Sequence, residues 1–171
     1  MKTFLIYFLL GVLMCLWLPG IGFSNSQYLS LRKVGELKEG SYSDVFVQGR
    51  YAYCAAAKTG LDIIDVSDPS IPKKIGNYDT PGYAIKLHVS GNYAYVADRG
   101  GGLQVIDVSR PQAPVRVGNY STSGRVEDVC VIGTIAYVAN GYDGLSILDV
   151  SNPAAPFMKG QCNKINWLDA T

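Results

Sequence analysis

The sequence has little of the chemistry that catalysis or metal binding requires. Its 171 residues include one histidine, His88, so a site built from several histidines is impossible, and a Ser-His-Asp triad would have to use that residue. His88 stands where two segments of similar sequence carry Phe46 and Cys130, which favours a packed position in a strand. We therefore predict that the chain is not an enzyme and that it holds no metal and no cofactor.

A predominance of one charge sign is also lacking. Lys and Arg together number 15, and Asp and Glu number 14. No basic run predicts nucleic-acid binding, and there is no acidic tail. The chain is instead rich in turn and strand formers, with 19 Gly, 12 Tyr and 8 Pro in a sequence that is 48% hydrophobic. This composition favours many short strands over helices and predicts an ordered all-β protein that does not bind nucleic acid.

Long apolar runs are absent except at the N-terminus. Lys2 precedes an apolar stretch at 4–18, which a Pro-Gly pair interrupts and small residues follow, as in secretory signal peptides. We predict a signal peptide at 1–24, cleaved after Ser24 or alternatively after Ser26. An uncleaved anchor helix is the competing interpretation. The mature chain would be secreted, either extracellular or in the cell envelope, without a membrane span.

Cysteines are few, and cleavage would leave three of the four: Cys54, Cys130 and Cys162. An odd number does not make a complete disulfide framework in a secreted protein. Cys54 and Cys130 stand where similar segments carry mostly apolar or aromatic residues. We expect both to be small apolar fillers in strands rather than a bridged pair.

The strongest positive signal is a repeated heptapeptide. Leu-Asp-Ile-Ile-Asp-Val-Ser at 61–67 returns with small changes at 103–109 and 145–151, at a spacing of 42 residues each time. A period of this length predicts a repeat protein. We divide the remaining chain into a lead-in at 25–34 and a repeat region at 35–171, with units at 35–75, 76–117 and 118–159 and the start of a fourth at Gly160.

Each unit is predicted to form four antiparallel strands. In the first unit, alternating apolar residues predict strands at 44–47 and 51–55 around a glycine turn, the heptapeptide is the third strand, and a basic outer strand follows at 73–78. In the third unit this last strand starts at Phe157. Four strands in about 42 residues, without a helix signal, are typical of a β-propeller blade. A solenoid is the competing repeat architecture.

One aspartate recurs in each heptapeptide, as Asp65, Asp107 and Asp149. The recurrence suggests a metal or catalytic site, but an Asp before Val-Ser-x-Pro most simply accepts hydrogen bonds from backbone N–H groups in a turn. A site is usually needed once, whereas a structural turn is needed in every unit. We predict the structural role.

The motif Leu-x-Ile/Val-Ile/Leu-Asp-Val-Ser-x-Pro-x-x-Pro, preceded by Gly-x-x-Ala-Tyr-Val-Ala, resembles the LVIVD repeat family. The resemblance covers residues 35–160 and departs at Cys54, where the other copies have Val, and at Ile135, where they have Tyr. It implies a β-propeller in a secreted or surface protein. It implies fold and location rather than a particular chemistry.

Three units are fewer than the four to eight blades of a typical closed propeller. An open arc would leave apolar faces and unpaired edges at its ends. The sequence could be a fragment of a longer chain, two copies could associate head to tail and close the propeller, or the stack could stand open with protected ends. We favour the fragment, in which the lead-in would supply an outer strand that closes the ring with the last blade.

The loops divide between two faces of such a stack. The first-to-second and third-to-fourth connections share one face and are nearly identical in the three units, as structural turns are. The other two sets share the opposite face and diverge, and variation on a rigid scaffold is where binding usually occurs. Tyr and Arg favour interface hot spots, so the candidate binding residues are Tyr42, Tyr83, Arg99, Arg125 and Tyr142.

These observations favour a secreted or cell-surface β-propeller module that acts as a non-catalytic binding scaffold for a protein or glycan ligand. The alternative is a fragment of an extracellular propeller-containing hydrolase whose active site lies outside this chain. A purely structural element of the cell envelope is a third hypothesis.

Overall fold

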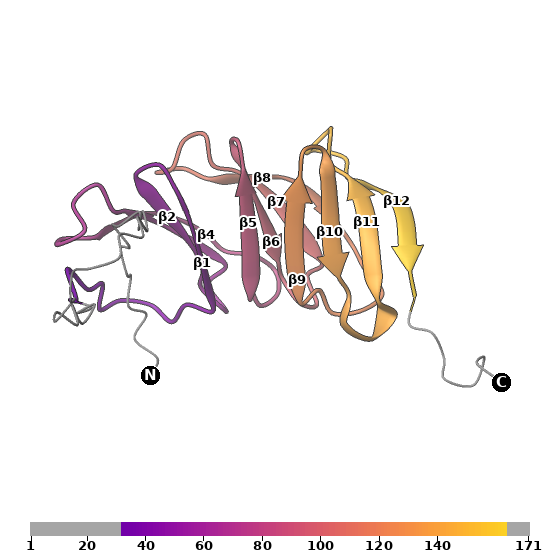
Figure 1. The fold of residues 1–171 in the computed structure, drawn as a ribbon, viewed down its shortest axis with the longest axis horizontal. Helices are drawn as coiled ribbons and strands as arrows, with labels where there is room; N and C mark the ends of the chain where they lie inside the picture. Colours follow the sequence, from indigo (N-terminus) through magenta and orange to yellow (C-terminus); the bar gives the residue numbers. More distant parts are fainter. Residues whose placement is uncertain (1–31, 164–171) are drawn as a thin grey trace, which may run out of the picture.

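A computed structural model describes residues 32–163 (Figure 1). The predicted signal peptide and most of the lead-in lie outside these residues. Within 32–163, twelve strands form three separate four-stranded antiparallel sheets, each in simple chain order. Sheet 1 contains β1 (Asp44–Gln48), β2 (Tyr51–Ala55), β3 (Leu61–Asp65) and β4 (Lys73–Tyr78). Sheet 2 contains β5 (Lys86–Ser90), β6 (Tyr93–Ala97), β7 (Leu103–Asp107) and β8 (Val115–Tyr120). Sheet 3 contains β9 (Asp128–Ile132), β10 (Ile135–Ala139), β11 (Leu145–Asp149) and β12 (Phe157–Cys162).

The turns of each sheet follow from the repeated sequence. Gly49, Gly91 and Gly133 form the hairpin between the first two strands with φ near +60° (61°, 57° and 60°), a conformation that glycine adopts without a steric penalty. Asp65 Oδ1 accepts a hydrogen bond from the Ser67 backbone N–H at 2.9 Å. The Asp107 and Asp149 carboxylates repeat this contact at 2.8 Å and 2.9 Å. The predicted turn role of the three aspartates is confirmed.

The three sheets lie face to face in a row (Figure 1), and they do not close into a ring. Contacts between sheets concentrate on the first two strands: β5 lies against β1 and β2, and β9 lies against β5 and β6. The first strands therefore form the inner edge of an arc, and the fourth strands its outer edge. The prediction of an all-β stack of propeller blades is confirmed.

Two hydrophobic clusters join the sheets. The cluster between sheets 1 and 2 includes Tyr53, Leu61 and Ile63 of sheet 1, which pack against Leu87 and Val96 of sheet 2. The same positions of the next pair of sheets form the second cluster. His88 packs in β5 with its ring 4.9 Å from that of Phe46, centroid to centroid, and partial burial lowers its pKa. The predicted packed position of the only histidine is confirmed.

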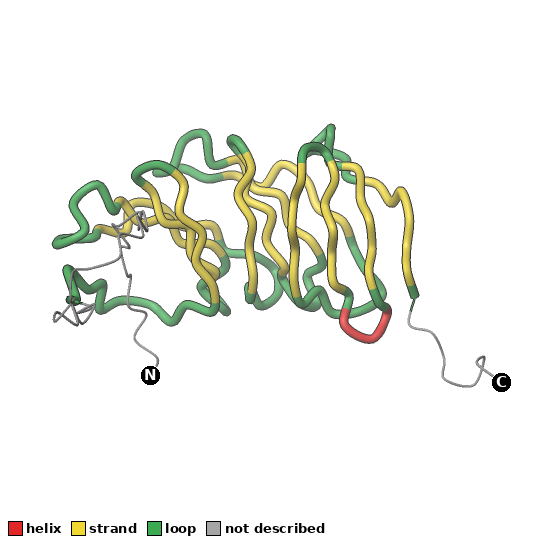
Figure 2. Tube along the Cα trace, in the orientation of Figure 1, coloured by secondary structure: helices red, strands yellow, loops and turns green. Residues whose placement is uncertain are grey.

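The structural units are offset from the sequence units. The boundaries predicted at 75/76 and 117/118 cut through β4 and β8. Gly160 does not begin a fourth sheet, because it lies inside β12, the complete outer strand of sheet 3. One short 3-10 turn, Gly141–Asp143, joins β10 to β11 (Figure 2).

The N-terminal end of the row is covered by residues that precede β1. Leu37 and Tyr42 pack over Ala52, Cys54 and Ile64 of sheet 1, which are 1%, 4% and 5% exposed. Burial thus raises the pKa of the Cys54 thiol to about 12. The predicted apolar role of Cys54 is confirmed.

The chain around Gly35, at the start of the first predicted unit, also occupies the place of an outer strand. Gly35 lies so close to the Pro69 carbonyl that a Cβ would not fit, and Gly76 and Gly118 meet the Pro111 and Pro153 carbonyls of the following sheets in the same way. The chain around Gly35 therefore contacts sheet 1 as β4 contacts sheet 2. Within the described part it forms no strand ladder of its own.

Candidate binding face

The structure places the two divergent sets of loops on one face, as predicted. The β2–β3 loop and the β4–β5 loop meet in an isolated bridge between Ala57 and Ala84, and the corresponding loops of the next sheets meet between Arg99 and Val126. We call the surface formed by residues 56–60, 79–85, 98–102, 121–127 and 140–144 the loop face. The bridges give it a fixed backbone, so its side chains are presented by a rigid support.

Arg99 and Tyr83 form the most organised part of this face. The Arg99 guanidinium carbon lies 5.3 Å from the centre of the Tyr83 ring, within range of a cation–π interaction. On its other side, Arg99 Nε lies 4.0 Å from the Glu127 carboxylate, and 43% of the Arg99 side chain stays exposed. Arg99 has a φ of +43°, a strained conformation for a residue with a Cβ, and its carbonyl accepts the Val126 N–H at 3.2 Å.

Asp98 connects the two loops that carry Arg99 and Tyr83. Its buried carboxylate accepts the Thr80 hydroxyl at 2.6 Å and the Gly82 N–H at 2.7 Å. Burial raises the pKa of Asp98, the bonds from Thr80 and Gly82 partly oppose that rise, and the nearby Asp79 charge adds to it. The carboxylate is therefore a structural connector beneath the loop face.

The third loop has a different construction. Asn140 takes the position of Asp98, and its amide donates to Ser146 Oγ at 2.7 Å. Asp143 accepts the Ser123 hydroxyl at 2.9 Å and so joins the two neighbouring loops. Above this support the Tyr142 side chain is 91% exposed. Arg125 is also exposed, so four of the five predicted residues lie on the loop face.

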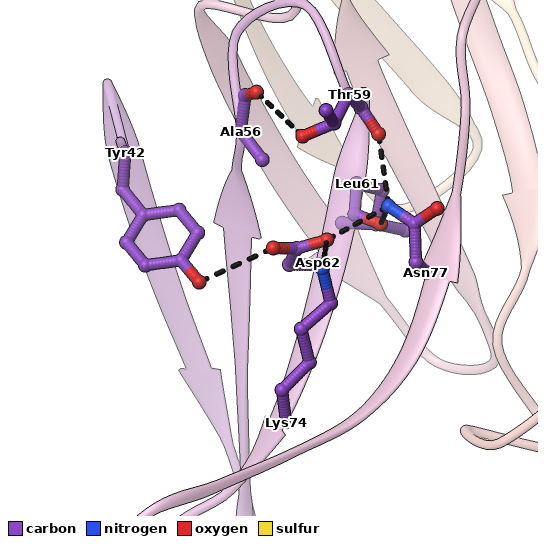
Figure 3. Close-up of polar contacts among 7 residues, drawn as sticks. All are labelled: Tyr42, Ala56, Thr59, Leu61, Asp62, Lys74 and Asn77. Carbon is purple, nitrogen blue, oxygen red and sulfur yellow. Dashed lines mark hydrogen bonds and ion pairs between the residues drawn. The ribbon is translucent and has the colours of Figure 1, made fainter. Parts of the chain in front are cut away.

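Tyr42 is the exception, because it belongs to the covered end of the row. Its hydroxyl donates to Asp62 Oδ2 at 3.2 Å (Figure 3). Asp62 is buried and also pairs with Lys74 at 2.7 Å and accepts the Asn77 amide at 2.7 Å. Burial, together with the Asp62 charge, raises the pKa of Tyr42. Tyr42 therefore lies outside the loop face and packs over sheet 1.

A groove of about 360 Å³ lies between sheets 1 and 2 on the opposite face. Its lining includes Arg50, Tyr51, Asn92 and Ser109. Arg50 pairs with Asp65 at 2.6 Å and lies 5.2 Å from the Tyr51 ring centre. Sequence reasoning assigned only structural turns to this face. The available signal was the residue after the hairpin glycine, which differs between units as Arg50, Asn92 and Thr134.

Metal-binding clusters and membrane-spanning helices are both absent from residues 32–163. No three His, Cys, Asp or Glu side chains gather there in a way that could hold a metal ion. No helix in that part of the chain is long and apolar enough to cross a bilayer.

Comparison with known proteins identifies the repeat. The LVIVD repeat model matches three consecutive segments, at 39–80, 81–122 and 123–164. Among solved structures, the β-propeller domain of Cps50 (Swd1) from Myceliophteria thermophila superposes with a TM-score of 0.60 at 14% identity, over 78% of this chain and 42% of that one. The chain therefore spans less than half of that propeller, and the likeness concerns the fold alone. No curated protein matches the chain significantly.

Proposed function

Because this chain belongs to the LVIVD repeat family, we propose that it is a secreted or cell-surface scaffold that binds a protein or glycan ligand without catalysing a reaction. The observation that carries this proposal is the Arg99–Tyr83 pair, held on a bridged backbone on the face where the three units differ. The apolar residues that all three units share serve to stack the sheets. The loop residues that differ between units are free to serve recognition.

The chemistry of the pair favours a ligand with an acidic or hydroxyl-rich surface. A guanidinium that stacks on an aromatic ring keeps its outer N–H groups available for carboxylates or sugar oxygens. Tyr142 and Arg125 extend the same surface with a second aromatic ring and a second positive charge. Tyr and Arg contribute large contact areas to binding hot spots.

The proposal is tested by binding of the mature chain to arrays of immobilised glycans and extracellular proteins. The double variant Arg99→Ala, Tyr142→Ala should lose capture of any ligand the wild type retains, while the melting temperature falls only slightly. Alanine at position 99 removes contacts with Tyr83 and Glu127 that contribute about 1 kcal/mol or less at a partly exposed side chain, and Tyr142 is almost fully exposed.

The matched control is Arg50→Ala, which removes an exposed arginine that stacks on a tyrosine on the opposite face. This control should retain capture. If the double variant binds as the wild type does, or if the control alone abolishes capture, the loop face is not the binding site.

A further inference from the structure

The outer face of sheet 3 repeats a surface that is buried elsewhere in the molecule. This surface, which we call the open face, consists of the side chains that point away from sheet 2: Cys130, Ile132, Ile135, Tyr137, Ala139, Leu145 and Ile147. Tyr137 is 37% exposed, whereas its counterparts Tyr53 and Tyr95 are 3% and 4% exposed. Ile132 is 66% exposed. The predicted packing of Cys130 as a strand filler is therefore wrong, because its side chain is exposed on this face.

The structure shows twice what covers a surface of this kind. Sheet 1 is covered by small and branched residues of sheet 2 and of the loop before it, namely Ala84 from the loop and Leu87, Val89, Ala94, Val96 and Ile106 from the strands. Sheet 2 is covered by the matching residues, namely Val126 from the loop before β9 and Val129, Val131, Ala136, Val138 and Leu148 from the strands of sheet 3. The covering faces of sheets 2 and 3 thus show which residue types, at which spacing, fit against a surface like the open face.

Polar contacts between first strands join sheets 1 and 2. The Asp44 carboxylate of sheet 1 accepts the Leu87 N–H of sheet 2 at 3.0 Å and lies 3.4 Å from Lys86 Nζ. Asp128 takes the position of Asp44 in sheet 3 and is exposed. The inner edge of sheet 3 therefore carries the acceptor that such a contact uses.

Sheet 1 of a second copy of the chain does not offer a free surface that could cover the open face. The matching face of sheet 1 is already covered by Leu37 and Tyr42, and the chain around Gly35 occupies the place of a neighbouring outer strand. Sheet 3 has its own outer strand, β12, which would compete for that place if two copies stacked head to tail.

We propose that the open face is a docking surface for a further four-stranded LVIVD-type sheet, one that presents an uncovered face like those of sheets 2 and 3. The occupant would place a branched apolar side chain over Tyr137 and Leu145, and a first strand with its N–H groups toward Asp128. Its contacts would repeat those between sheets 1 and 2.

The test extends the chain by one unit. Residues 165–171 are replaced by a second copy of residues 81–122, which follows position 164 in the register of the family repeat and contains no cysteine. With Cys162→Ser in the background, maleimide labelling of Cys130 reports cover of the open face. Labelling should be slower by about tenfold in the extended chain, because a docked residue reacts only through local opening. A Tyr137→Cys reporter in a Cys130→Ser, Cys162→Ser background should give the same result at the centre of the face.

A pair of matched variants separates docking from simple extension. Aspartate at the copy's equivalent of Val96, which faces the docking surface, should restore fast labelling. Aspartate at the equivalent of Val105, which faces away, should not. Equal labelling rates in the extended and original chains, or proteolysis of the added unit while the original chain survives, would overturn the proposal. Protection in the original chain that grows across about a hundredfold rise in concentration would also overturn it, by identifying a second copy as the occupant.

Discussion

Replacing Asp98 by alanine should destabilise the protein by removing the connection between two loops of the loop face. The substitution removes the shared acceptor for the Thr80 hydroxyl and the Gly82 N–H, and no side chain at position 98 then connects the two loops. Asp98 is 0% exposed, so water does not readily replace the lost partner. A buried polar group left without a hydrogen bond costs about 1–3 kcal/mol.

With two such groups, and some relief from no longer burying a charge, Asp98→Ala should lower the free energy of unfolding by about 2–4 kcal/mol. In a domain of this size that is roughly 6–15 °C in melting temperature. Asp98→Asn keeps one acceptor oxygen and removes the charge that burial disfavours. It should cost less than about 1 kcal/mol. Asn140 already occupies the equivalent position in the third unit.

The raised pKa of Asp98 also sets a pH dependence. In the window between its unfolded and folded pKa values the native state binds more protons than the unfolded state, so stability falls as pH rises through that window. The Asn variant should lack this contribution. Urea unfolding of the three proteins across acidic to neutral pH measures both effects. An Asn variant as unstable as the Ala variant, or an Ala variant within about 0.5 kcal/mol of wild type, would refute the assigned role of Asp98.

Three further predictions concern other parts of the stack. Tyr42→Phe removes one hydrogen bond to Asp62 and should lower the free energy of unfolding by about 1 kcal/mol in urea titration, with binding at the loop face unchanged. Ala57→Gly relieves a φ of +53° and should raise the free energy of unfolding by up to about 1 kcal/mol, with a matching rise in melting temperature. A lower melting temperature would show that the packing of the alanine methyl group outweighs the backbone strain. Hydrogen bonds from Ser67 hold the pKa of Asp65 at about 2, and those from Ser151 do the same for Asp149. The stability that these two carboxylates contribute should be fully present above their unfolded pKa and disappear as pH falls toward 2. Asp149→Asn should therefore make the melting temperature fall less steeply as the pH is lowered.

Features that recur in every unit could be predicted from the sequence. The hairpin glycines, the Asp-Val-Ser turns and the position of His88 are set by local geometry or by residues a fixed distance along the chain. The division of the loops between two faces follows because consecutive strands run in opposite directions, so that successive loops lie at opposite ends of the sheet.

The features that the sequence did not predict depend on which residues lie next to each other in the folded structure. Cys130 has the sequence environment of a filler and is exposed because its face has no neighbouring sheet in the described part of the chain. Lys74 is basic, as an edge strand favours, yet it pairs with the buried Asp62. The register between β3 and β4 also shifts at Ile63/Ile64, next to that pair, and simple alternation does not predict such a shift. The sequence pattern predicts Tyr42 to be a loop residue like Tyr83, but in the structure Tyr42 packs over sheet 1.

The close approach of glycine to a proline carbonyl has a consequence for how this sequence can change over time. Gly76 against Pro111 and Gly118 against Pro153 make the two joints between sheets alike. A duplication or deletion of one whole 42-residue segment inside the repeat region would therefore rejoin surfaces that already fit. The number of sheets within the repeat region can thus change by recombination within the gene without creating a new kind of junction between neighbouring sheets.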